Sequence, residues 1–181
     1  TENWKRPQRE VNALMELLVN TINKEIKNLQ KNKIKLSAIG DLKSLPSATQ
    51  RELQKAIEAT KHNTQLEVIL ALSYSSRWEI TQGLKNLCED VKKGEVDIDT
   101  INEEQVCSYL ATHGRPDPEL MIRTSGEMRI SNFLLWQLAY AELIFSPKLW
   151  PDFRGADLIQ AVIDYQKRER RFGMTSEQVK A

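Results

Sequence analysis

The residues best suited to chemistry lie in one stretch, 121–142, which reads MIRTSGEMRISNFLLWQLAYAE. Arg123 follows what we expect to be the end of a buried strand. The pair Ser125-Gly126 predicts a turn in which glycine lets the backbone approach a ligand closely. Arg129 and Ser131 are two apart, so in an extended segment they would point the same way. Two guanidinium groups beside a hydroxyl suit an anion with several oxygens, and a pyrophosphate is the natural candidate.

Ser131 also stands where the cap of a helix is expected, because a run of apolar residues follows it. A helix start presents free N–H groups and a partial positive charge, which would strengthen the anion site. An alternative interpretation needs no ligand. Arg123 and Arg129 could instead pair with Glu127 and Glu142 in a surface network, since structural ion pairs are common.

Four segments together resemble the cis-prenyltransferase family. In chain order they read TENWKRPQREV, SRWEI, IRTSGEMRISNFLLWQLAYAEL and LWPDF. The third is similar to the C-terminal signature of the family over a long and nearly gap-free stretch. The resemblance covers essentially all 181 residues and is closest to the bacterial members that make undecaprenyl pyrophosphate.

The resemblance implies a transferase that uses Mg2+ and condenses farnesyl pyrophosphate with successive isopentenyl pyrophosphates in cis. The product would be undecaprenyl pyrophosphate, the lipid carrier precursor for bacterial cell-wall synthesis. A homodimer is implied, in the cytoplasm or peripheral at the inner face of the membrane to which product is delivered. Two alternatives stay open: a product of another length, or a catalytically silent subunit that supports an active partner.

The resemblance also implies roles for individual residues. Asn3 matches a residue to which proton acceptance is assigned, although a neutral amide is a poor base and positioning a water or phosphate suits it better. Glu142 is implied as a Mg2+ ligand. The substrate-binding residues implied are Thr1, Glu2, Trp4, Arg6, Arg123, Arg129, Ile130 and Ser131.

In the family, a first strand, an Asp-Gly-Asn-Gly-Arg loop and a helix come before the segment that matches Thr1. The loop aspartate helps to hold the metal and the allylic pyrophosphate. We therefore expect residues 1–181 to be one catalytic domain that is N-terminally incomplete. Glu142 alone would be a weak metal site, because Mg2+ usually needs substrate oxygens and another carboxylate.

Helical and strand patterns alternate along the chain. The expected helices cover 10–32, 46–61, 77–92 and 157–170, with shorter ones after Asn102 and from Ser131; the expected strands cover 34–40, 66–74, 120–122 and 141–145. The alternation predicts an α/β single domain with a mostly parallel β-sheet flanked by helices. Ligands should then lie at the carboxyl ends of the strands. The basic run 167–171 is typical of a solvated helix end.

Composition limits the possible partners. The formal net charge of +1 does not suggest nucleic acid, so no nucleic-acid partner is expected and any anion site must be local. No apolar run approaches the ~18 residues of a membrane span. Cys88 and Cys107 lack the spacing of metal ligands and are expected to be reduced, as in a cytosolic protein.

Overall fold

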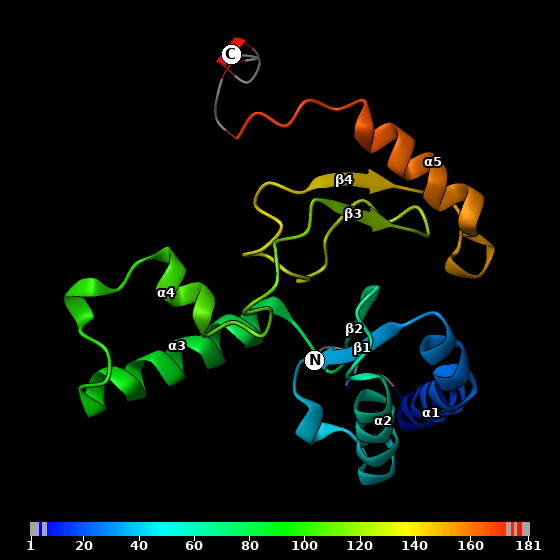
Figure 1. Ribbon diagram of the computed structural model, residues 1–181, viewed down its shortest axis with the longest axis horizontal. Helices are drawn as coiled ribbons and strands as arrows, with labels where there is room; N and C mark the ends of the chain where they lie inside the picture. Colours follow the sequence, from blue (N-terminus) through cyan, green and yellow to red (C-terminus); the bar gives the residue numbers. More distant parts are fainter. Residues whose placement is uncertain (1–3, 5–6, 173–174, 176, 179–181) are drawn as a thin grey trace. The chain divides into compact units, whose positions relative to one another are not determined.

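The computed structural model describes residue 4, residues 7–172, residue 175 and residues 177–178 (Figure 1). The chain separates into two compact units, Thr1–Gly114 and Arg115–Ala181. Among the described residues, each unit has one pair of parallel strands. The predicted α/β class with parallel pairing is confirmed, but the described strands form two separate two-stranded sheets.

The first unit is built around the parallel strands β1 (Ile34–Ile39) and β2 (Leu66–Ala71), paired from Ile34↔Leu66 to Ile39↔Ala71. Its helices are α1 (Gln8–Lys31), α2 (Ser47–Thr60), α3 (Ser76–Lys93) and α4 (Glu103–Ser108), with 3-10 turns at Leu42–Ser44 and Ile98–Thr100. The helices α1 and α2 lie together beside β1, as Figure 1 shows in blue and teal. These boundaries agree closely with those expected from the apolar periodicity.

The core of the first unit forms where α1, α2 and β1 meet. Its buried residues are Ile22, Leu36, Leu45, Leu53 and Ala56. Thr60 ends α2 in full burial, and its hydroxyl donates to the Ala56 carbonyl (2.9 Å) while accepting from the Leu36 N–H (3.0 Å). This hydroxyl ties the last turn of α2 to β1, so the strand that leads to the functional loops has a fixed position.

Two of the helices in this unit end or begin as their sequences indicate. The helix α3 ends at Lys93 and is capped by Gly94, whose φ of 78° is a left-handed conformation that glycine adopts without strain. Asn102 caps α4 by accepting a hydrogen bond from the Gln105 N–H at 2.9 Å, and α4 is the short helix expected after Asn102.

The second unit contains β3 (Leu120–Arg123), β4 (Glu142–Phe145) and α5 (Gly155–Gln166), with a 3-10 turn at Trp150–Asp152. The strands β3 and β4 are parallel, with Leu120 opposite Glu142 and Arg123 opposite Phe145. In the described part of the chain, none of the helices has the length and apolar character that crossing a bilayer requires.

The prediction that a helix begins at Ser131 is wrong. Residues 131–140 form successive turns, and Ser131, Asn132 and Leu134 have φ angles of 51°, 60° and 46°. A right-handed helix cannot contain such left-handed residues. Leu134 and Leu138 are nevertheless buried, and the Leu138 N–H bonds to the Leu134 carbonyl at 2.9 Å. The apolar spacing therefore indicates which side chains are buried, and in this segment they are buried without forming a helix.

The last helix also ends earlier than expected, at Gln166 instead of residue 170. Arg168 and Arg170 follow it, and their guanidinium groups bind Glu142 and Glu119. The predicted basic helix end is wrong at these two positions because the helix stops before them; Arg168 is exposed, and each arginine has a carboxylate partner within the second unit.

Candidate active site

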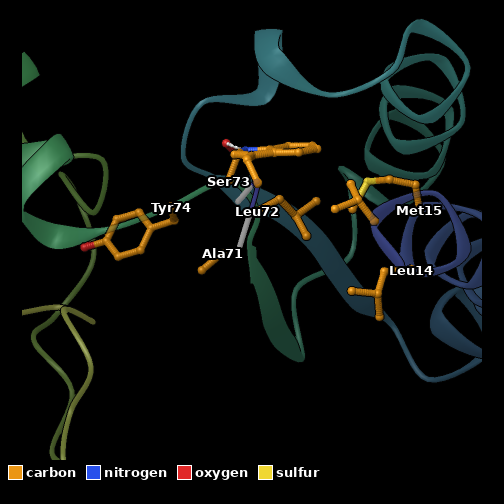
Figure 2. A pocket seen from close by; sticks show the side chains of 8 residues that line it. Leu14, Met15, Ala71, Leu72, Ser73 and Tyr74 are labelled. Atoms are coloured by element: carbon orange, nitrogen blue, oxygen red, sulfur yellow. Dashed lines mark hydrogen bonds between the residues drawn. The ribbon is translucent and has the colours of Figure 1, made fainter. Parts of the chain in front are cut away.

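A cavity of about 170 Å³ opens in the first unit where β2 ends (Figure 2). The residues that line it are Trp4, Val11, Leu14, Met15, Ala71, Leu72, Ser73 and Tyr74. Leu14 and Met15 come from α1, and residues 71–74 end or follow β2. Ligands were expected at the carboxyl ends of the strands, and this cavity lies at such an end.

Trp4 is fixed at the cavity by its indole nitrogen. Nε1 donates to Oγ of Ser73 at 2.7 Å, and the same oxygen accepts from Oγ of Ser44 at 2.8 Å. Ser73 has a φ of 47°, which is uncommon for a residue with a side chain. The two hydroxyls and the indole therefore hold the loop after β2 in one conformation beside Trp4.

The ring of Tyr74 points away from Leu14 and Met15, as Figure 2 shows. Its hydroxyl donates to Oε2 of Glu79 at 2.6 Å, and Oε1 of Glu79 accepts from the Ala111 N–H at 2.9 Å. Glu79 is only 2% exposed. A buried carboxylate thus connects the cavity loop, α3 and the segment after α4. Sequence reasoning missed this role, although an acidic residue in the first turn of a helix was a visible signal.

Four of the predicted site residues lie outside the described residues. They are Thr1, Glu2, Asn3 and Arg6. Trp4 is the one member of this segment whose side chain is described, and it lines the cavity. The assignments of the other four remain predictions of the sequence.

The second cluster lies at the carboxyl ends of β3 and β4. Arg123 is the last residue of β3, and Ser125 and Gly126 follow in a turn with φ angles of 69° and 68°. The Ser125 N–H donates to the Lys148 carbonyl (2.7 Å), and the Gly126 N–H donates to the Ser146 carbonyl (2.9 Å). The loop after β3 is therefore fastened to the loop after β4, which confirms the predicted turn.

Arg129 pairs with Glu127. The Arg129 side chain is 68% exposed, and an exposed pair contributes only about 0–1 kcal/mol, so an anionic ligand could replace Glu127 at small cost. Arg123 is half-buried and has no ion-pair partner within the described residues. One pair of the proposed surface network is thus present. Ser131 follows at a φ of 51°, so the backbone is not extended at this residue.

Ile130 lies between Arg129 and Ser131 and is half-buried. Its carbonyl accepts a hydrogen bond from the Phe133 N–H at 3.2 Å, which closes the first turn of residues 131–140. The four residues of this segment that are predicted to bind substrate therefore lie on a single connected loop, with Arg123 at its strand end and Ser131 at its first turn.

An ion pair also supports this loop. Nζ of Lys148 lies 2.5 Å from Oδ1 of Asp157, and Oδ2 of Asp157 accepts from the Arg154 N–H at 2.9 Å. The Lys148 ammonium, together with that N–H, holds the pKa of Asp157 below its ordinary value. Because the Lys148 carbonyl receives the Ser125 N–H, the start of α5 is connected to the turn after Arg123.

Glu142 begins β4 at the end opposite to Arg123. Its Oε2 accepts from Nη1 of Arg168 at 2.7 Å. Among the described residues, no group of three or more His, Cys, Asp or Glu side chains lies close enough to hold a metal ion. Mg2+ commonly binds one or two carboxylates and takes its other oxygens from water and substrate phosphates. Glu142 therefore offers a magnesium ion one carboxylate from the described residues, which alone makes a weak site and fits only beside oxygens that a substrate brings.

The family model described as "Putative undecaprenyl diphosphate synthase" matches residues 1–173. An isoprenyl transferase of Chlorobaculum tepidum is 51% identical over 99% of this chain and 68% of its own length. A Pasteurella multocida protein named ditrans,polycis-undecaprenyl-diphosphate synthase, (2E,6E)-farnesyl-diphosphate specific, is 46% identical over 98% of this chain and 74% of its own length.

Solved structures agree with the sequence relatives. Lavandulyl diphosphate synthase from Lavandula x intermedia, in complex with dimethylallyl diphosphate, has a TM-score of 0.92 and 36% identity, over 95% of this chain and 75% of that one. A probable undecaprenyl diphosphate synthase from Campylobacter jejuni has a TM-score of 0.84 and 36% identity, over 95% and 78%. The resemblance in the four sequence segments is confirmed, and the chain belongs to the undecaprenyl diphosphate synthase family of prenyltransferases.

Proposed function

We propose that this chain is a transferase that condenses farnesyl diphosphate with successive isopentenyl diphosphates in cis to form undecaprenyl diphosphate. The observation that carries the proposal is the 46% identity, over 98% of the chain, to the Pasteurella multocida protein whose name specifies this product and farnesyl diphosphate. A Vibrio vulnificus protein of the same name aligns with the whole chain at 42% identity.

The proposed reaction breaks a C–O bond and a C–H bond and forms a C–C bond. The C–O bond to the allylic diphosphate breaks, the double bond of isopentenyl diphosphate attacks the allylic carbon, and loss of a proton restores a double bond. Negative charge develops on the leaving diphosphate, so fixed cationic groups and N–H donors at its oxygens lower the barrier. Catalysis in this scheme is mainly electrostatic, and it requires little covalent chemistry from the protein.

Arg123, Arg129, Ile130 and Ser131 are proposed to bind the diphosphate of isopentenyl diphosphate. The support is local: two guanidinium groups and a hydroxyl lie on one loop, which two backbone hydrogen bonds fasten to the end of β4. A guanidinium group can bind two phosphate oxygens in parallel. Arg129 would exchange the exposed carboxylate of Glu127 for a phosphate group.

The second proposed substrate region is the cavity at the end of β2. Its apolar side chains, Leu14, Met15 and Leu72, suit the hydrocarbon part of a prenyl substrate. Trp4, with Thr1, Glu2, Asn3 and Arg6 before and after it in the chain, is proposed to bind substrate there. Asn3 would position a water or phosphate oxygen, because a neutral amide is a poor proton acceptor.

Mg2+ is the proposed cofactor, with Glu142 as one of its ligands. When bound, the ion would neutralise charge on the substrate diphosphate. The role of the chain is to present one carboxylate oxygen from the first residue of β4. We further propose that the two units act as one catalytic domain, and that the protein is a cytoplasmic homodimer which delivers its product to the membrane.

A specific observation favours a second candidate, a cis-prenyltransferase with another product length. The solved structure with a TM-score of 0.92 is a lavandulyl diphosphate synthase in complex with dimethylallyl diphosphate. The same fold therefore accepts substrates much shorter than farnesyl diphosphate, and family membership alone does not fix the length of the product.

Product analysis distinguishes these candidates. The protein is incubated with farnesyl and isopentenyl diphosphates, with and without Mg2+, and products are separated by chromatography and weighed by mass spectrometry. Undecaprenyl diphosphate formed only with Mg2+ supports the first proposal. A uniform product of another length supports the second. Turnover that appears only after a second prenyltransferase subunit is added would identify a silent partner subunit and contradict both.

A further inference from the structure

The segment after α5 is fastened to the amino ends of both strands in the second unit. Nη1 of Arg168 donates to Oε2 of Glu142, which begins β4. Nη1 of Arg170 donates to Oε1 of Glu119 at 2.6 Å, and Glu119 comes immediately before β3. The Glu142 N–H also donates to the Glu119 carbonyl at 2.9 Å, so the two strand starts are joined directly.

Arg168 binds Glu142 in a way that restricts its carboxylate. The same nitrogen, Nη1, also donates to the Leu143 carbonyl at 3.0 Å. The guanidinium group is thus held by the backbone of β4 as well as by the carboxylate, and it cannot follow Glu142 freely through its rotamers. The Glu142 side chain is 25% exposed, and no described residue donates a hydrogen bond to its Oε1.

We propose that Arg168 is a positioning residue for Glu142: it fixes Oε2, and so leaves Oε1 as the oxygen that binds the magnesium–diphosphate substrate. This inference rests on the proposed function, in which Glu142 is a magnesium ligand. Carboxylates that bind metals are commonly held by a hydrogen-bond partner in this way, and such partners determine the orientation of the ligand. Arg168 itself makes no contact with the substrate in this proposal.

The alternative is that Arg168 only stabilises the fold. The chain offers a matched control, because Arg170 lies two residues further along the same segment and binds Glu119, which is no proposed ligand. A merely structural role predicts that Arg168→Gln and Arg170→Gln have the same kind of effect. A positioning role predicts that only Arg168→Gln changes the response to magnesium.

The experiment measures binding of inorganic diphosphate by calorimetry at increasing Mg2+ concentration. It compares the wild type, Arg168→Gln, Glu142→Gln and the double variant. We expect Arg168→Gln to raise the half-saturating Mg2+ concentration about tenfold, the usual effect of removing a partner of a metal ligand. In the Glu142→Gln background, Arg168→Gln should add nothing. We expect Arg170→Gln to leave this concentration unchanged even where the melting temperature falls.

The proposal would be overturned if Arg168→Gln changed the half-saturating Mg2+ concentration by the same factor in the wild type and in the Glu142→Gln background. Arg168 would then act independently of Glu142. Arg168→Lys keeps a positive donor for Oε2, so partial recovery is expected and gives a second variant if Arg168→Gln folds poorly. No recovery, with normal folding, would also count against it. Product formation by the wild type tests the proposed function separately. If the wild type makes product but the effects of Arg168→Gln and Glu142→Gln on magnesium response are independent, only the positioning role is overturned.

Discussion

Arg123 and Glu142 lie at opposite ends of the paired strands β3 and β4. Arg123 is opposite Phe145, whereas Glu142 is opposite Leu120. Three residues of strand separate the two positions, or roughly 10 Å at about 3.3 Å per residue. Glu142 pairs with Arg168 instead of with Arg123. Substitution of Arg123 should therefore change the KM for isopentenyl diphosphate, whereas substitution of Glu142 should change the response to magnesium.

Arg123→Ala should raise the KM for isopentenyl diphosphate at least about tenfold. The reason is that it removes a charge-assisted hydrogen bond worth roughly 1.5–3 kcal/mol. Steady-state kinetics with isopentenyl diphosphate varied at saturating farnesyl diphosphate checks this. Arg51→Ala, at an exposed arginine of α2, is the control and should leave KM unchanged. Unchanged kinetics with a lower melting temperature for Arg123→Ala would favour a structural role.

Glu127→Gln should leave the KM for isopentenyl diphosphate unchanged or lower it by up to about fivefold, whereas Arg129→Ala should raise it. Glu127 competes with substrate for the Arg129 guanidinium group, and an exposed pair is worth up to about 1 kcal/mol. The same assay, repeated at low and high salt, measures both variants. If Glu127→Gln raises KM as much as Arg129→Ala does, Glu127 instead orients the arginine for substrate.

Trp4→Phe and Ser73→Ala should have similar effects that do not add. Each removes the 2.7 Å hydrogen bond between the indole and the Ser73 hydroxyl, and Trp4→Phe preserves an aromatic ring. A neutral hydrogen bond contributes about 0.5–1.5 kcal/mol, so the KM for farnesyl diphosphate should rise roughly two- to tenfold. A double-mutant cycle makes the measurement. Additive effects would mean that the two residues act separately.

Asp157→Asn should remove part of the pH dependence of stability. The folded pKa of Asp157 is lowered, mainly by Lys148, so the carboxylate stabilises the fold above its unfolded pKa. That stabilisation is lost as pH falls below about 4, through the folded pKa. Urea denaturation from pH 6 to pH 3 should show a difference in the free energy of unfolding between wild type and Asp157→Asn that narrows on acidification. A difference that stays constant over this whole range would contradict the assignment.

The protein should sediment at twice the mass of the 20.9 kDa chain at micromolar concentration. Closed two-fold dimers are the commonest homo-oligomers. We expect β4 and its neighbouring helices near the two-fold interface, as the family resemblance implies. Analytical ultracentrifugation with parallel activity assays makes the measurement. A monomer that retains full activity would contradict the predicted assembly.

The sequence predicted elements well where apolar spacing and burial agree. The strands β1 and β2 and the helices α1, α2 and α3 fall within a few residues of their expected bounds. The prediction from sequence was wrong at Ser131, where apolar residues recur with helical spacing but the backbone dihedral angles exclude a helix. Periodicity reports which side chains are buried, and it does not report φ angles.

The candidate site shows the same division between local and distant information. The turn at Ser125-Gly126 and the loop position of Arg123 follow from neighbouring residues, and they were predicted. The partners Arg168 and Glu142 are 26 residues apart in the chain, and no local pattern indicates that they pair. Glu79 likewise binds Ala111, 32 residues away, which composition and spacing could not show.

Gly40 has a φ of 113°, and a Cβ added to it would lie 2.1 Å from the Leu72 carbonyl oxygen and 3.0 Å from Cβ of Tyr74. Leu72 and Tyr74 line the cavity at the end of β2, whereas Gly40 does not. A side chain at position 40 would therefore displace the cavity wall from behind. The volume of the cavity thus depends on the absence of a side chain at position 40. A substitution of Gly40 could change that volume without changing any residue that lines the cavity.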